Sequence, residues 1–217
     1  MSSTSLLRHP DATLPTLAAV SYAVLAWAGG LVLLIVGQQP LVLTGATLLL
    51  AHGMVIAAYM LHECAHNAVF RSPEHNARLG RALNWLTGGC YGRYEDVRHK
   101  HMRHHVDNAD VVTCDYRGIL QRHPRLLRLV QTLEWAYIPG VELLMHALQI
   151  LMPFTEPERR DQRGRVLVVL AIRGGAFALL AVFAPLAAAL YGVAYLLFLT
   201  VLRFMDAFQH NFELLVG

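Results

Sequence analysis

One uncharged stretch, residues 12–62, constrains the fold of this chain more than any other feature, because it contains no Asp, Glu, Lys or Arg. A bilayer core is crossed by roughly 20 apolar residues in a helix, so the stretch is long enough for two crossings and a tight turn. Gly37 and Pro40 supply that turn, since glycine and proline end one helix and begin the next. We therefore expect membrane spans at residues 16–36 and 41–61.

A second uncharged stretch, residues 174–202, is too short for two full crossings by itself. With Pro185 as the turn, we predict spans at residues 165–184 and 186–205, which places Arg173 inside the third span. An arginine at the bilayer centre costs about 2.5–3.5 kcal/mol on insertion scales, and less where it faces a polar interior. The sequence thus predicts an all-α integral membrane protein with four transmembrane helices in two hairpins.

The distribution of charge predicts which side of the membrane each segment faces. Charged residues make up 15% of the chain, against about 25% in soluble domains, and the arginines are concentrated between the two hairpins. The positive-inside rule places residues 62–164 and both termini in the cytoplasm. We expect residues 134–152 to form an interfacial helix. The net charge of +3 is explained by this topology and gives no reason to expect nucleic-acid binding.

Histidine is the second informative residue type, because seven of the twelve histidines lie between His62 and His105. In LHECAHNAVF, His62 and His66 are four residues apart and share a helix face. In HKHMRHH, His101, His104 and His105 also share one face. Five imidazoles exceed the three protein ligands of a catalytic zinc. The pattern therefore indicates two metal ions held in a cytoplasmic helical cap, or one metal ion with spare histidines, and the first interpretation is the more economical.

Further candidates follow the fourth predicted span, where Asp206 and His210 are four residues apart. They can reach the same cluster, because helical bundle proteins build metal centres from side chains of several helices.

The residues alone are compatible with two other functions. A membrane zinc protease would use His62 and His66 as ligands, Glu63 as general base and Asp206 as third ligand. That alternative leaves the second histidine group unexplained. A metal transporter or haem carrier needs polar groups within the spans. His52 is the one histidine there, and we expect it to be a buried hydrogen-bonding residue.

HECAH followed by HMRHH, each next to a membrane hairpin, resembles the first two histidine boxes of the membrane fatty-acid desaturase family. DAFQHNFE resembles the segment after the fourth span in bacterial members, and the likeness covers roughly residues 41–213. It implies a di-iron centre that uses O₂ and two electrons to remove two hydrogens from a lipid acyl chain. Asp206 would contact metal through water, and the iron ligands would be His62, His66, His101, His104, His105 and His210.

The resemblance carries further expectations. Related histidine-box hydroxylases and ketolases share the boxes and remain an alternative, and electrons would come from an external ferredoxin or cytochrome b5 type donor. Candidate second-layer carboxylates are Glu63, Asp96 and Asp107, and candidate substrate-lining residues are Trp85, Tyr91 and Tyr94.

The family has a third box, and no histidine follows His210. We therefore expect residues 1–217 to form one desaturase-like domain, in a bacterial inner membrane, that lacks its C-terminal part.

Overall fold

The computed structural model describes residues 6–9, 12–107 and 115–209, except for the side chains of His104, Asp107 and residues 206–209. Within these ranges every regular element is helical. The α-helices are α1 (Thr13–Val36), α2 (Pro40–Ala65), α3 (Pro73–Leu86), α4 (Tyr94–Asp107), α5 (Tyr116–Arg122), α6 (Pro124–Trp135), α7 (Gly140–Thr155), α8 (Arg163–Phe183) and α9 (Pro185–Gln209), with short 3₁₀ helices η2 (Gly89–Tyr91) and η3 (Pro157–Gln162).

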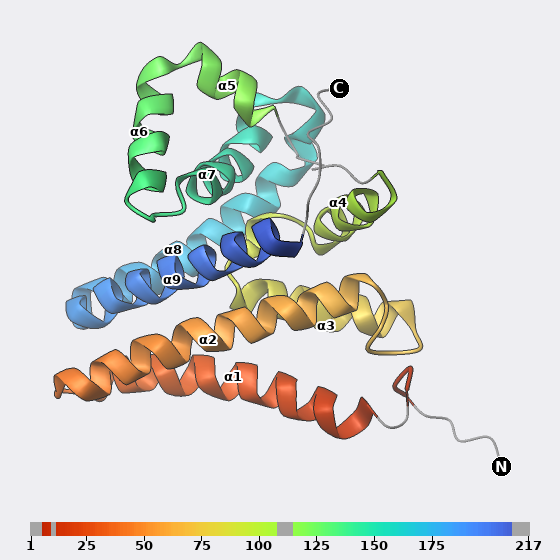
Figure 1. Ribbon diagram of the computed structural model, residues 1–217, viewed down its shortest axis with the longest axis vertical. Coiled ribbons are helices and arrows are strands. Elements are labelled where there is room, and N and C mark those ends of the chain that lie inside the picture. Colours follow the sequence, from red (N-terminus) through yellow and green to blue (C-terminus); the bar gives the residue numbers. More distant parts are fainter. Residues whose placement is uncertain (1–5, 10–11, 108–114, 210–217) are drawn as a thin grey trace.

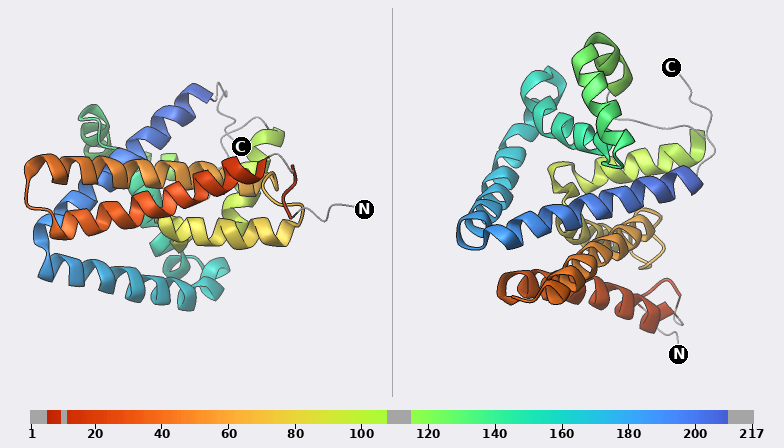
Figure 2. Two further views of the ribbon diagram at one scale, coloured as in Figure 1. Left: turned by 90° about the horizontal axis from the view of Figure 1, so that it is seen from below. Right: turned by 60° about the vertical axis from the view of Figure 1, so that its left-hand side comes forward.

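Four helices, α1, α2, α8 and α9, are long and apolar enough to cross a membrane. The predicted four-span, all-helical fold is therefore confirmed. Figures 1 and 2 show that the turn between α1 and α2 and the turn between α8 and α9 lie at the same end of the bundle, with α4 at the opposite end. Pro40 and Pro185 each stand at the first position of the second helix in their hairpin, where a missing N–H costs nothing.

The core of the bundle lies between α1, α2 and α9. Leu50 and Met54 of α2 are fully buried against Phe198 of α9. Two glycines bring α1 and α2 close together. A Cβ on Gly30 would lie 2.9 Å from the Cβ of Leu50, and one on Gly53 would lie 2.9 Å from the backbone nitrogen of Trp27. Small residues at such contacts allow the close backbone approach on which packing between membrane helices depends.

The segment after α2 folds back along that helix. Leu83 of α3 and Tyr94 of α4 are buried in one apolar cluster with Ala57 and Cys64 of α2. Gly88 makes the turn between α3 and α4 possible, since its φ of 81° is a conformation that side-chain-bearing residues rarely adopt. This turn returns the chain so that α4 lies beside the end of α2.

Two expectations about local structure are corrected. Residues 134–152 do not form one helix: α6 ends at Trp135 and α7 begins at Gly140. Pro139 lacks an N–H and disfavours helix in the residue before it, which explains the break. His52 is not buried, although it is hydrogen-bonded. Its Nδ1 lies 2.7 Å from the hydroxyl of Tyr22, and both side chains are exposed on the outer surface of the α1–α2 hairpin.

The break between α6 and α7 brings two carboxylates to the last turns of α9. Arg203 donates to Glu142 at 2.8 Å and forms an ion pair with Glu134 at 3.0 Å. These pairs attach the segment between the two hairpins to α9.

Candidate metal centre

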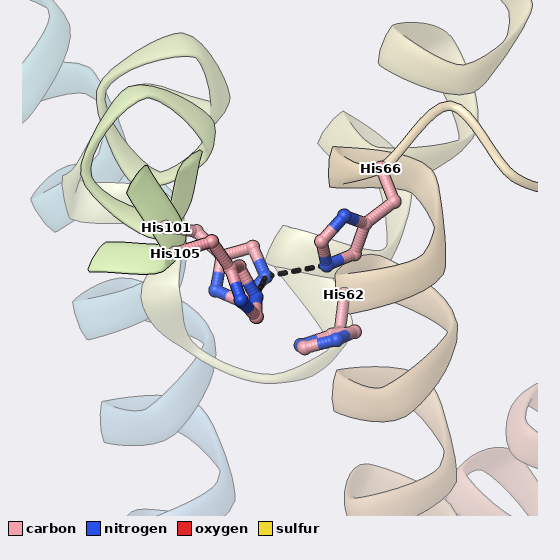
Figure 3. Close-up of side chains that lie close together, drawn as sticks. All are labelled: His62, His66, His101 and His105. Atoms are coloured by element: carbon pink, nitrogen blue, oxygen red, sulfur yellow. Dashed lines mark hydrogen bonds between the residues drawn. The ribbon is translucent and has the colours of Figure 1, made fainter. Parts of the chain in front are cut away.

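Four imidazoles from two helices converge at the end of the bundle that lies opposite the hairpin turns. His62 and His66 come from the last turn of α2 and its cap, and His101 and His105 come from α4 (Figure 3). One ring nitrogen from each of them lies within 4.8 Å of the corresponding nitrogen of the other three. The predicted convergence of the two histidine groups is therefore present for these four residues.

The cluster is tight enough to hold metal. Nε2 of His66 lies 2.8 Å from Nε2 of His101, which in turn lies 3.1 Å from Nε2 of His105. The His62 and His101 ring centroids are 4.2 Å apart. Two nitrogens on one ion lie at most about 4.2 Å apart, twice the metal–nitrogen distance of about 2.1 Å. Small side-chain rotations therefore suffice for the four rings to coordinate one ion or a close pair.

The chemistry of the donors narrows the class of metal. The cluster consists of imidazole nitrogens, which suit iron, copper, zinc and nickel, whereas magnesium and calcium require oxygen ligands. The residues present thus fit a transition metal.

Arg98 attaches α4 to the end of α2. It lies on the same face of α4 as His101 and His105, and its Nε donates to the carbonyl oxygen of Ala65 at 2.8 Å. That carbonyl is one of the last of α2, where the helix leaves acceptors without partners within the helix. The arginine therefore holds the two histidine-bearing helices together directly beside the imidazoles.

Two contacts fix the start of α4 against α3. Tyr94 packs so closely on Gly80 that a Cβ there would overlap its ring, and burial raises the pKa of the Tyr94 hydroxyl to about 12. Arg81 donates to Glu95 at 2.8 Å through Nε. Burial raises the pKa of the Glu95 carboxyl, but the hydrogen bond and charge of Arg81 outweigh it, so the pKa lies below its usual value.

The remaining predicted metal-site residues fall into two groups. Glu63 is exposed, and Asp96 forms an ion pair with Arg93 at 2.9 Å. His104 and Asp107 lie on α4 and Asp206 on α9, but their side chains are outside the described part of the structure, as is all of His210. Their roles stay predictions.

The protease alternative gains no support from this geometry. Imidazoles of α4, rather than a carboxylate, stand next to the His62 and His66 pair among the described residues.

A second feature lies within the membrane-spanning part of the bundle. A cavity of about 750 Å³ is bordered by α1, α3, η2, α7, α8 and α9. Trp85 and Tyr91, two of the three predicted substrate-lining residues, are on its wall. The side chain of Tyr94, the third, packs instead against Gly80 of α3.

Sequence reasoning did not assign four polar residues to this wall: Arg173, His146, Tyr191 and Tyr195. The Tyr195 hydroxyl lies 3.0 Å from Nε2 of His146, whose Nδ1 lies 2.8 Å from the carbonyl oxygen of Glu142. Arg173 was one indication of this wall in the sequence, since an arginine inside a predicted span is costly unless it faces a polar site.

A bundle of four apolar helices with an imidazole cluster at one end is the architecture of a histidine-rich membrane protein whose cluster is compatible with a metal site. The chain belongs to the fatty acid desaturase family, whose profile matches residues 38–216. The family consists of oxidoreductases that act on lipids in a membrane. No curated protein and no solved structure gives a significant match.

Proposed function

We propose that this protein is an O₂-dependent di-iron desaturase that introduces a double bond into a lipid acyl chain. The observation that carries the proposal is the convergence of His62, His66, His101 and His105 from two separate helices into one cluster. Membership of the fatty acid desaturase family gives that cluster its expected chemistry.

The described histidines supply part of the ligand set. His104, on the same face of α4, and His210 with Asp206, after the last span, are proposed to add to it, and the family's third histidine box would supply the remaining ligands. Bound iron would activate O₂, the oxidant needed to remove hydrogen from an unactivated methylene, which no side chain of the chain can do. The protein's own part is to hold the imidazoles, through Arg98 and the packing of Tyr94, and to place an acyl chain beside them.

Zinc is the least suitable metal for this reaction, because it has no redox chemistry. Metal analysis of the purified protein expressed from its whole gene therefore tests the proposal directly. Two irons per chain are expected, and one zinc per chain with no iron would contradict it. Reduction by an external ferredoxin or cytochrome b5 type donor is part of the proposal, as is a cytoplasmic location of the histidine cluster.

Lipid analysis distinguishes the proposed reaction from its relatives. Cells that express the gene should gain a lipid two mass units lighter than its precursor, with a double bond that chemical derivatisation locates. The matched control is the His101→Gln variant, which should gain none. A product sixteen mass units heavier would instead identify the related hydroxylase activity, and one fourteen units heavier would identify a ketolase.

A further inference from the structure

We infer that the cavity beside α8 binds a long-chain carboxylate, with its anionic end held by Arg173. The inference rests on three observations about that cavity: the position of its one arginine, the neutral character of the groups around that arginine, and the apolar walls.

Arg173 lies near the middle of α8 and borders the cavity. Its guanidinium donates to the carbonyl oxygen of Trp85, contacts Sγ of Cys90 at 3.6 Å and lies 3.5 Å from the hydroxyl of Tyr191. A guanidinium carries five N–H donors in a planar fork. These contacts account for at most three of the five N–H groups, and Arg173 itself lines the cavity.

The charge of Arg173 is not neutralised by any carboxylate among the described residues. Each of its contacts is to a neutral group. Arg203 on α9, by contrast, forms ion pairs with two glutamates. A cation within a membrane-spanning segment is costly unless it pairs with an opposite charge or a ligand. An anionic ligand would supply the missing charge.

The rest of the cavity wall suits hydrocarbon. The apolar lining of this cavity of about 750 Å³ includes residues of α1 and α8: Trp27, Leu31, Ile172, Phe177 and Leu180. Sites for single ligands run from about 300 to 1,000 Å³ and combine apolar walls with a few polar groups. One cation on an apolar wall is complementary to an amphiphile with one anionic end.

A purely structural role for Arg173 predicts something different. Trp85 lies in the last turn of α3, so the arginine also satisfies a carbonyl at the negative end of that helix. If this were its whole function, the cavity would bind acids, alcohols and alkanes of one length equally well. Discrimination between these ligands by the unmodified protein therefore separates the two roles without any mutation.

The binding itself does not depend on the proposed function; only the identification of this acid as the substrate rests on it. A free carboxylate held by Arg173 would mean that the enzyme accepts unesterified fatty acid. Binding is measured on metal-free protein, so a failure here and an absence of new lipid products are separate results.

Tryptophan fluorescence provides a direct measurement, because two of the chain's three tryptophans, Trp27 and Trp85, line the cavity. The third, Trp135, is 88% exposed on α6 and can be removed as Trp135→Phe. In this background, in lipid nanodiscs, quenching is titrated with bromine-substituted octadecanoic acid, octadecanol and octadecane. The alkane gives the level of quenching that results from partition into lipid.

We expect saturable quenching by the acid at a concentration about 10-fold lower than by the alcohol, as charge-assisted hydrogen bonds allow. Arg173→Met should abolish that preference, and Arg173→Lys, which keeps the charge, should retain part of it. Arg165→Gln is the matched control. Arg165 lies two turns earlier on α8. It donates to carbonyl oxygens of η2, including that of Tyr91 at 2.8 Å, but does not border the cavity. Equal quenching by all three probes, or an acid preference that survives in Arg173→Met, would overturn the inference.

Discussion

The two membrane hairpins of this protein differ in how their helices are packed. In the α1–α2 hairpin, Gly30 and Gly53 let the backbones approach closely, and α2 buries residues along most of its length. In the α8–α9 hairpin, α9 joins the core, but α8 buries just Val166 and Val169 of its described residues. A Cβ on Gly174 or Gly175 would meet nothing within 4 Å in the described structure.

The difference corresponds to a division of roles. The tightly packed hairpin carries His62 and His66 and also anchors α4 through Arg98, so the imidazole cluster stands on the more closely packed part of the bundle. The loosely packed helix borders the cavity. A metal centre requires ligands held to within a fraction of an ångström, whereas a lipid site requires space and an opening between helices.

The largest expected effect concerns the cluster on the first hairpin. His66→Ala should lower the affinity for iron or cobalt by more than about 100-fold, because loss of a ligand exceeds the 10–100-fold typical of residues that only orient ligands. Metal bound per chain, measured by mass spectrometry after dialysis, gives the result. His99→Gln is the control, since His99 lies exposed on α4 outside the cluster. Equal metal loss in both variants would show that the cluster is not the binding site.

The packing contrast itself can be tested with one substitution in each hairpin. Gly53→Ala should lower stability by about 1–3 kcal/mol, because its methyl group meets the backbone of Trp27, which cannot rotate away. Gly175→Ala should leave stability unchanged or raise it by up to about 1 kcal/mol, since alanine favours helix and the space is open. Thermal unfolding in detergent compares the two. Similar losses in both variants would remove the contrast.

The fold could be predicted from the sequence because membrane helices follow from charge and length alone. Uncharged stretches, with Gly37, Pro40 and Pro185 as breaks, give all four helices to within four residues at every end. What could not be predicted depends on local contacts. The break between α6 and α7 depends on the backbone of Tyr137, whose φ of 59° lies in the left-handed region two residues before Pro139. The exposure of His52 depends on the rotation of α2, which an apolar helix with little amphipathic pattern does not specify.

The site was predictable to the extent that helix periodicity applies. Spacing placed His62 with His66, and His101 with His105, on common faces, and the structure brings the two pairs together. Spacing could not show that Arg98 joins α4 to Ala65, or that Arg173 reaches Trp85, because those contacts join residues 33 and 88 positions apart. Both are consequences of how the chain folds back after α2.

An intermediate effect is expected where α4 is attached to the first hairpin. Arg98→Ala should weaken metal binding by about 10-fold, since α4 loses the hydrogen bond that fixes it beside the α2 ligands. Arg98→Lys should restore part of that affinity, because an ammonium can still donate to the Ala65 carbonyl. Cobalt titration followed by visible absorption measures both affinity and coordination geometry. Unchanged affinity and spectrum in Arg98→Ala would show that α4 is positioned without this contact.

The smallest effect concerns the Arg81–Glu95 pair, which joins α4 to α3. The two side chains are about half exposed, at 56% and 52%, so the pair contributes at most about 1 kcal/mol. The pKa of Glu95 is lower in the folded protein than its model-peptide value of 4.5, so the contribution is complete above pH 4.5. It is lost as the pH falls below 4.5 and through the folded-state pKa, where the carboxylate takes up a proton. Melting temperatures of the wild type and Glu95→Gln should therefore differ at pH 7 and converge in acid. A difference that persists in acid would mean that Glu95 stabilises α4 by packing instead of charge.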